Sequence, residues 1–297
     1  ADAKELVSRG SFQLSPGEDG FLIRFASDLY CYFWKQDKAV RLTHDSEEEQ
    51  EAEFSPDERM VSFLRNSNLY IVGLEDGRER ALTKEGTADI LYGRLDWVYQ
   101  EEVYGRGNYR AYWWSPDSTQ IALLRIDQSA EPVFPVVNHL PTLQELEKER
   151  YPKAGSGQPK ADLGIIRIRD GSLTWVDNFR YQAGEFLIVR VGWHPDSTRV
   201  VYQIQNRIQT WLDLNLAQAS DGKSKTLFRE TSPAWVEVIE EPVWLKDKSF
   251  LWLSDRSGYR HLYRYGEDGK LMQTLTEGKW DIASVVKVDE KNGWIYF

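Results

Sequence analysis

One short turn motif recurs along the chain and constrains the fold more than any other feature of the sequence. An aromatic residue followed by Ser-Pro-Asp occurs at Phe54–Asp57 and Trp114–Asp117, and Trp193–Asp196 has His in place of Ser. Proline presets φ at the second position of a type I turn, and Ser or Asp side chains bond the backbone of such turns. We therefore expect a turn before a strand at each copy, with the aromatic ring packed between neighbouring sheets.

The spacing of the motif predicts a repeat architecture. Weaker copies occur at Leu14–Gly17, Trp244–Asp247 and Val288–Lys291. The positions that align with the proline of the motif are 16, 56, 116, 195, 246 and 290, of which Lys246 and Glu290 are not proline. The intervals of 40, 60, 79, 51 and 44 residues include several close to the length of one four-stranded propeller blade, about 40–50 residues. The series predicts a β-propeller with about five blades present; a β-sandwich with similar turns by chance is the alternative.

Short aromatic and aliphatic runs supply the strands. The chain contains 12 Trp, 15 Tyr and 12 Phe, and many of them alternate with polar residues, as half-buried strands require. The clearest runs are Phe21–Phe25, Met60–Leu64, Gln120–Ile126, Arg199–Ile204 and Phe250–Leu253. These runs predict an all-β chain. A final strand is expected at Trp294–Phe297, and because the chain ends inside it we expect residues 1–297 to be a fragment of a longer propeller.

Charge and composition exclude several classes of function. The formal net charge of −10 disfavours binding to a phosphate backbone, so no nucleic-acid partner is expected. The apolar runs are far shorter than the roughly 20 residues that span a bilayer, so no membrane span is expected in this segment. Cys31 is the single cysteine, and the four histidines show no paired-ligand spacing, so neither a metal nor a cofactor is expected.

Two intervals exceed the blade length and predict insertions at about 94–108 and at 136–164. In the second, Thr142–Glu145 has the form of a capping box, which predicts a short helix through Arg150. Glycines and prolines from Tyr151 onward would end that helix and form an extended arm. A simple surface excursion and a functional arm remain equally open for this stretch.

The first insertion holds two adjacent acids between aromatic and aliphatic residues. Glu101 and Glu102 lie in the segment DWVYQEEVY, residues 96–104, whereas the acidic run at residues 47–51 has no apolar partners and is expected to be a solvated loop. Adjacent carboxylates repel each other unless a cation joins them, and together they can accept the three N–H donors of an ammonium. A ligand site is one interpretation. The other is that one glutamate pairs with Arg106 or Arg110 and the other faces water.

These segments resemble a known family. DWVYQEEVY at residues 96–104, WWSPD at 113–117, YPKAG at 151–155 and SDRSGYRHLY at 254–263 look like the N-terminal propeller of dipeptidyl peptidase IV-type serine peptidases, in that family's order. The resemblance covers about residues 50 to 297. It implies an eight-bladed propeller, of which this chain is an incomplete part, followed by a C-terminal α/β-hydrolase domain.

The resemblance also implies a function and its residues. Members of the family remove Xaa-Pro or Xaa-Ala dipeptides from peptides with a free N-terminus, and their paired glutamates hold the substrate ammonium. Those positions are Glu101 and Glu102 here, while Tyr104 falls where the family has an aromatic residue near the substrate. The resemblance further implies a homodimer of the full-length enzyme, with the arm at 136–164 as the candidate contact.

One departure from the family bears directly on catalysis. No Gly-x-Ser-x-Gly sequence occurs, so the nucleophile elbow is absent, no catalytic residue is assigned and the chain is not expected to hydrolyse substrate by itself. The alternatives are a non-catalytic protein-binding or scaffold propeller and an inactive relative of the peptidase. Because the chain has one cysteine where secreted animal relatives have several, we expect a bacterial protein of the periplasm or cytoplasm.

Overall fold

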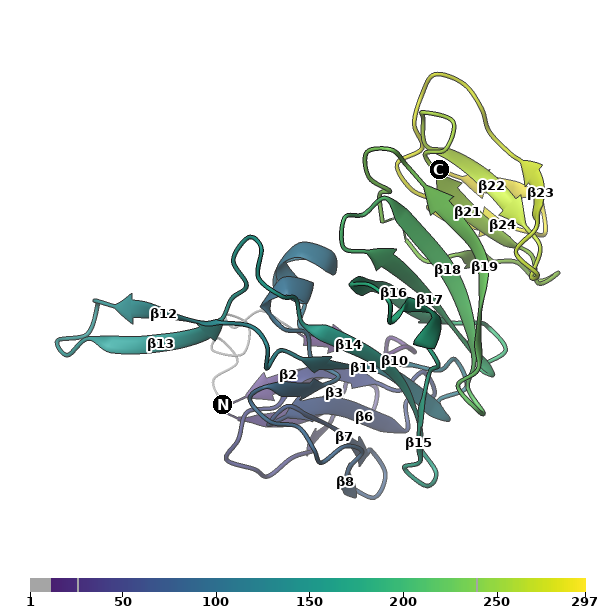
Figure 1. The fold of residues 1–297 in the computed structure, drawn as a ribbon. Coiled ribbons are helices and arrows are strands. Elements are labelled where there is room, and N and C mark those ends of the chain that lie inside the picture. Colours follow the sequence, from purple (N-terminus) through teal and green to yellow (C-terminus); the bar gives the residue numbers. More distant parts are fainter. Residues whose placement is uncertain (1–11, 26, 239) are drawn as a thin grey trace. The chain divides into compact units, whose positions relative to one another are not determined.

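The computed structural model describes residues 12–25, 27–238 and 240–297, which form two compact units joined at Leu173 and Thr174 (Figure 1). Almost every regular element is a β-strand, and the sheets are antiparallel; strands that are consecutive in the sequence pair in most of them, with the third sheet as the exception. The all-β prediction is confirmed. The repeated four-stranded sheets, one after another along the chain, are the blades that the turn spacing predicted.

The first unit contains three blade sheets. The first sheet has β1 (Phe12–Leu14), β2 (Gly20–Phe25), β3 (Asp28–Phe33) and β4 (Lys38–Arg41). The second has β5 (Gln50–Phe54), β6 (Met60–Arg65), β7 (Asn68–Gly73) and β8 (Glu79–Ala81). The third has β10 (Tyr112–Trp114), β11 (Gln120–Asp127), β14 (Lys160–Arg167) and β15 (Leu173–Trp175), and β9 (Ile90–Tyr92) adds to β11.

The second unit continues the same pattern. A four-stranded sheet is formed by β16 (Phe186–Trp193), β17 (Arg199–Asn206), β18 (Trp211–Gln218) and β19 (Ser224–Thr231), and a 3-10 turn, η2 (Phe179–Tyr181), precedes it. The next sheet has β20 (Val243–Trp244), β21 (Phe250–Ser254), β22 (His261–Tyr265) and β23 (Leu271–Thr274). The last pair is β24 (Lys287–Asp289) with β25 (Trp294–Tyr296).

The recurrent motif forms the turn between the first and second strands of each sheet, as predicted. At Phe54–Asp57, the Ser55 backbone N–H donates to Met60 O (2.9 Å), and Ser55 Oγ bonds Asp57 Oδ1 (2.7 Å). The residue after the aspartate takes a left-handed conformation, with φ of 56° at Glu58 and 68° at Lys248. A left-handed residue after a type I turn gives the connection the twist that antiparallel strands need.

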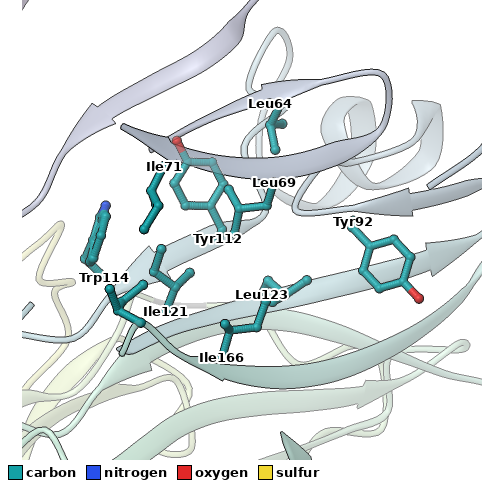
Figure 2. Close-up of a cluster of buried hydrophobic side chains, with 10 residues drawn as sticks. Leu64, Leu69, Ile71, Tyr92, Tyr112, Trp114, Ile121, Leu123 and Ile166 are labelled. Carbon is teal, nitrogen blue, oxygen red and sulfur yellow. The ribbon is translucent and has the colours of Figure 1, made fainter. Parts of the chain in front are cut away.

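The aromatic residue of the motif packs between sheets in the first unit. Trp114 is buried, and its indole N–H donates to Ser62 Oγ of the neighbouring sheet (2.8 Å). Figure 2 shows side chains from β6 and β7 facing those from β10, β11 and β14 across this interface. The cluster consists of Leu64, Leu69, Ile71, Tyr92, Tyr112, Trp114, Ile121, Leu123, Ile166 and Ile168. The motif therefore sets the sheet interface as well as the turn.

The second long insertion differs from its prediction. Residues 142–150 are not helical, because β13 (Glu145–Arg150) pairs with β12 (Val133–Asn138) in a two-stranded ribbon that projects from its sheet (Figure 1). The ribbon begins before residue 136, and residues 160–164 belong to β14 in the blade. Cross-strand pairs such as Val137 with Leu146 prevail over the local helix signal, which came from a capping box alone.

The acidic run at residues 47–51 is only partly the solvated loop that was expected. Glu49 is fully buried, and its Oε1 accepts a hydrogen bond from the Arg65 guanidinium at 3.1 Å. Arg65 also pairs with Glu79. A buried charge requires a partner of opposite charge, and Arg65 at the end of β6 is that partner for Glu49. Sequence spacing gave no sign of this long-range pair.

Candidate functional site

The two glutamates lie in a loop between β9 and β10 that is closed at its base. Arg94 and Arg110 form an isolated antiparallel bridge. The Leu95 N–H donates to Tyr109 O, and the Ala111 N–H donates to Gly93 O, each at 2.8 Å. These bonds join the two ends of the loop, and Leu124 of β11 binds both ends, because the Gly93 N–H donates to Leu124 O and the Leu124 N–H donates to Ala111 O, each at 2.9 Å. The predicted insertion at about 94–108 is thus a short structured loop with a rigid base.

A capped helical turn carries the glutamates. Asp96 is buried, and its carboxylate accepts hydrogen bonds from the backbone N–H groups of Val98 (3.0 Å) and Tyr99 (3.4 Å). The turn continues as a π-helix, η1 (Tyr99–Val103), in which the Tyr104 N–H donates to Tyr99 O at 2.8 Å. Asp96 satisfies N–H groups that the start of a helix leaves without partners, so it fixes where the turn begins.

Glu101 and Glu102 differ in their surroundings. The Glu101 carboxylate is ion-paired with the Arg106 guanidinium; the Glu101 side chain is 15% exposed, and that of Arg106 is 83% exposed. Glu102 is exposed to solvent. The pKa of Arg106 is raised, chiefly by its hydrogen bond to Glu101 and then by the charges of Glu101 and Glu102. This pairing is the one that the second interpretation of the sequence described.

Tyr104 packs on the side of the same turn. Its ring centroid lies 6.2 Å from that of Tyr99 and 6.0 Å from that of Trp113 on β10. The loop then turns back through Gly105 and Gly107, whose φ angles of 105° and 84° suit only glycine. Gln100 Oε1 accepts the Gly107 N–H at 2.9 Å, which ties the helical turn to this returning segment.

Further acids and arginines lie at the inner strands beside the loop. Glu53 on β5 is ion-paired with Arg110, and the hydroxyl of the buried Tyr112 donates to the Glu51 carbonyl oxygen. Burial raises the pKa of both Glu51 and Glu53, and the Arg110 charge opposes that shift. Arg110, at the end of the loop, therefore carries the charge that offsets the acids on the neighbouring strand β5.

A second buried acid lies where the β12–β13 ribbon leaves the sheet. Glu131 is 2% exposed, and neither of its carboxyl oxygens has a hydrogen-bond partner among the described residues. Burial raises its pKa to about 7, and the negative charge of Asp96 adds to the shift while Arg150 opposes it. Burial likewise raises the pKa of Asp96 to about 6, although its backbone hydrogen bonds act in the opposite direction.

The sequence located the glutamate loop but not its supports. Asp96 was identified only as the first letter of a motif, although an Asp two or three residues before buried backbone N–H groups is a recognised cap. Glu131 stands alone between Ala130 and Pro132, and no periodicity or spacing marks it. Burial and the proximity of its neighbours identify it only once the chain is folded.

Two classes of feature are absent from the described part of the chain. Across residues 12–297, apart from 26 and 239, no group of three or more His, Cys, Asp or Glu side chains is arranged to hold a metal ion. Within the same residues, none of the helices has the length and apolar character needed to cross a bilayer.

Comparison with known proteins places this geometry in context. The family model for the dipeptidyl peptidase IV (DPP IV) N-terminal region matches residues 19–297. A probable dipeptidyl peptidase 4 of Emericella nidulans is 28% identical over 293 residues, which is 92% of this chain and 37% of that protein. The dipeptidyl peptidase 4 of Trichophyton rubrum is 27% identical over 260 residues, covering 84% of this chain and 33% of that protein. The chain thus spans about a third of the length of these curated relatives.

Solved structures share the fold. The dipeptidyl peptidase 4 of Porphyromonas gingivalis superimposes with a TM-score of 0.83 at 23% identity, over 94% of this chain and 41% of that one. A putative dipeptidyl aminopeptidase IV from Bacteroides ovatus gives 0.76 at 22% identity, over 92% and 40%. The sequence relatives named above are fungal and these two structures are bacterial, so the bacterial source expected from the sequence remains a prediction.

Proposed function

The chain belongs to the dipeptidyl peptidase IV N-terminal region family, and on that premise we propose that it is part of the propeller of a serine exopeptidase. The complete enzyme would release Xaa-Pro or Xaa-Ala dipeptides from peptide N-termini. The observation that carries this proposal is the DWVYQEEVY segment, which lies within the family match and is held on a capped, anchored turn. The propeller would restrict access to the active site and position the substrate.

Glu101 and Glu102 would bind the free α-ammonium of the substrate. Two carboxylates offer several acceptor sites to the three N–H donors of the ammonium, and charge-assisted bonds of this kind are the stronger ones. Tyr104 would contribute the wall of the adjoining pocket. Because an α-amino group has a pKa near 8 and must be protonated to bind, substrate affinity should fall in alkaline solution.

Hydrolysis itself would belong to another part of the full-length protein. This chain contains no Gly-x-Ser-x-Gly sequence, so we assign it no catalytic residue. A C-terminal α/β-hydrolase domain would supply the serine and form an acyl-enzyme that water then releases. Fixing the ammonium at a set place determines which peptide bond meets that serine. Orientation of this kind can contribute several kcal/mol to lowering the barrier.

The decisive test compares peptides with free and acetylated N-termini, using the full-length protein. We expect cleavage of Xaa-Pro peptides with free amines and a large loss of kcat/KM after acetylation. Glu101→Gln and Glu102→Gln should each reduce kcat/KM for the free-amine peptide by about tenfold or more, as loss of a charge-assisted bond does. Glu75→Gln removes an exposed carboxylate elsewhere in the same unit and serves as the matched control.

Two outcomes separate this proposal from its alternatives. Equal cleavage of acetylated and free peptides would exclude an ammonium anchor at the glutamates. Absence of any peptidase activity in the full-length protein, with binding of a protein partner instead, would favour a scaffold propeller or an inactive relative. The exposed apolar residues of the β12–β13 ribbon are the observation that keeps a protein-binding role in view.

We also propose that the ribbon mediates homodimer formation. Its exposed apolar side chains are Val133, Phe134, Val136, Val137, Leu140, Leu143 and Leu146. An isolated two-stranded hairpin is marginally stable in water, and a large exposed apolar patch commonly marks a protein contact. A second copy of the chain can cover such a ribbon by the same surface on both subunits.

Size-exclusion chromatography with light scattering tests the dimer. Leu146→Asp in the full-length protein should shift the equilibrium towards the monomer, because it places a charge in a buried contact. Leu271→Asp changes an equally exposed leucine in the second unit and should leave the oligomeric state unchanged. A protein that is monomeric before any substitution would exclude the ribbon as a dimer contact.

A further inference from the structure

The base of the β12–β13 ribbon contacts the glutamate loop directly. The rings of Trp97 and Tyr151 meet edge to face, with centroids 4.4 Å apart, and Tyr151 also lies against Phe134 of β12. The Tyr151 N–H donates to Pro132 O at 3.0 Å and closes the base of the ribbon. Tyr151, which follows the ribbon, therefore packs on Trp97, the residue that opens the helical turn carrying Glu101 and Glu102.

Arg150 fixes this base from the other strand. Its guanidinium is ion-paired with Asp89 and donates to the backbone carbonyl oxygens of Ser129 and Glu131. The Glu131 N–H in turn donates to Gln128 O at 3.0 Å. The Glu131 backbone is thus held firmly, and its side chain is directed into the protein at 2% exposure with no hydrogen bond to either oxygen.

A buried carboxylate without partners is costly, whereas a buried carboxylic acid costs far less. Two charged groups act on Glu131: Asp96 raises the cost of ionising it, and Arg150 lowers that cost. Arg150 is already shared with Asp89 and two carbonyl oxygens. The Asp96 side chain is held in place because its oxygens cap the first N–H groups of the turn.

We propose that Glu131 is a positioning residue for the ammonium-binding glutamates: it stays protonated at the base of the ribbon, and its ionisation disturbs the Asp96 cap and with it the turn that holds Glu101 and Glu102. The proposal rests on the function proposed above for those glutamates. As the pH rises, Glu131 loses its proton to solvent, and the negative charge of the resulting carboxylate then repels Asp96. The cap weakens, and substrate binding weakens with it.

The test measures KM for a free-amine Xaa-Pro peptide between pH 6 and 8.5, using the full-length protein and Glu131→Gln. Glutamine keeps the shape and cannot ionise. We expect the ratio of wild-type KM to variant KM to be near one at pH 6 and to rise to about fivefold by pH 8, the effect of losing one typical helix cap. The substrate amine titrates identically for both proteins and cancels in the ratio. The midpoint should lie near pH 7, because burial raises the pKa of Glu131 to about 7.

Two further variants keep the result interpretable. Asp96→Asn retains a capping side chain but removes the charge. The rise in KM around pH 7 should therefore disappear in this variant, and the double variant with Glu131→Gln should have the same pH profile as Asp96→Asn alone. For the control Glu75→Gln, the ratio of wild-type KM to variant KM should not change with pH. A merely structural role of Glu131 would change the stability or the yield of the protein without this pH step in KM.

The outcomes distinguish the two proposals. If acetylation abolishes cleavage but Glu131→Gln leaves the pH profile of KM as in the wild type, the positioning role of Glu131 is wrong and the ammonium anchor stands. If acetylated and free peptides are cleaved equally well, Glu101 and Glu102 do not bind the substrate ammonium, and the positioning role proposed for Glu131 falls with that function.

Discussion

At the scale of single residues, the ion pair between Glu101 and Arg106 bears most directly on binding. Arg106 is a cation already placed on one of the two proposed ammonium ligands, and it is largely exposed. A bound substrate ammonium and the guanidinium would draw on the same carboxylate oxygens. Water solvates the exposed guanidinium and screens its charge, so Arg106 is a weak competitor that a substrate can displace.

Replacing Arg106 should therefore improve substrate binding. We expect Arg106→Ala to lower KM for free-amine peptides by about twofold to fivefold at low salt, which is the range that an exposed pair supports. The difference should shrink as salt screens the charges. Arg78→Ala, which removes an exposed arginine from the same unit, should leave KM unchanged. A rise in KM for Arg106→Ala would show instead that Arg106 orients Glu101 for binding.

At the scale of elements, the turn after the first strand of each sheet is the repeated unit of construction. In the five blade sheets its left-handed residue is Glu18, Glu58, Ser118, Ser197 or Lys248, and none of these is glycine. Non-glycine residues pay about 1 kcal/mol in this conformation, and an Asp side chain that bonds the backbone offsets the cost. In the turn before β21, Asp247 accepts the Ser249 N–H at 3.0 Å.

Glycine at that position should therefore stabilise the turn. We expect Lys248→Gly to increase the free energy of unfolding by about 0.5 kcal/mol, since the relief of the left-handed strain exceeds the added entropy of the unfolded chain. Lys246→Gly, two residues earlier at an ordinary φ, should decrease it by a similar amount. Urea unfolding followed by tryptophan fluorescence measures both. Equal effects of the two variants would contradict a strained Lys248.

At the scale of the whole molecule, buried acids make stability depend on pH. The fold raises the pKa of Asp96 to about 6 and that of Glu131 to about 7, from values near 4 in the unfolded chain. The folded state then holds protons that the unfolded state has lost, so stability falls as the pH rises from about 4 to 7. Asp170, whose pKa is lowered to about 2 by Ser172 and Arg167, acts in the opposite direction at lower pH.

We therefore expect the free energy of unfolding to pass through a maximum near pH 4–5 and to decline towards pH 7.5. Glu131→Gln should match the wild type near pH 3, where Glu131 is protonated in both states, and exceed it by about 3 kcal/mol at pH 7.5, because each unit of pKa shift corresponds to about 1.4 kcal/mol. Urea midpoints at four or five pH values measure the difference. A constant difference across that range would mean that Glu131 does not titrate with folding.

The sequence by itself determined the repeating part of the architecture. The Ser-Pro-Asp turns and the short alternating runs act through local backbone preferences and the two-residue period of a strand, so they can be interpreted without tertiary information. They predicted the all-β class, the blade sheets and the position of each first turn. The glutamate loop was located from its mixture of acids and aromatics and from its resemblance to a family.

Only the tertiary structure decided which side chains meet. The pairing of Glu49 with Arg65, the ribbon in place of a helix at residues 142–150, and the burial of Glu131 near Asp96 all join residues that are far apart in the chain or whose local signals point elsewhere. Such pairs arise because the ionisation and burial of a charged group depend on everything that packs around it, and packing is a property of the folded chain.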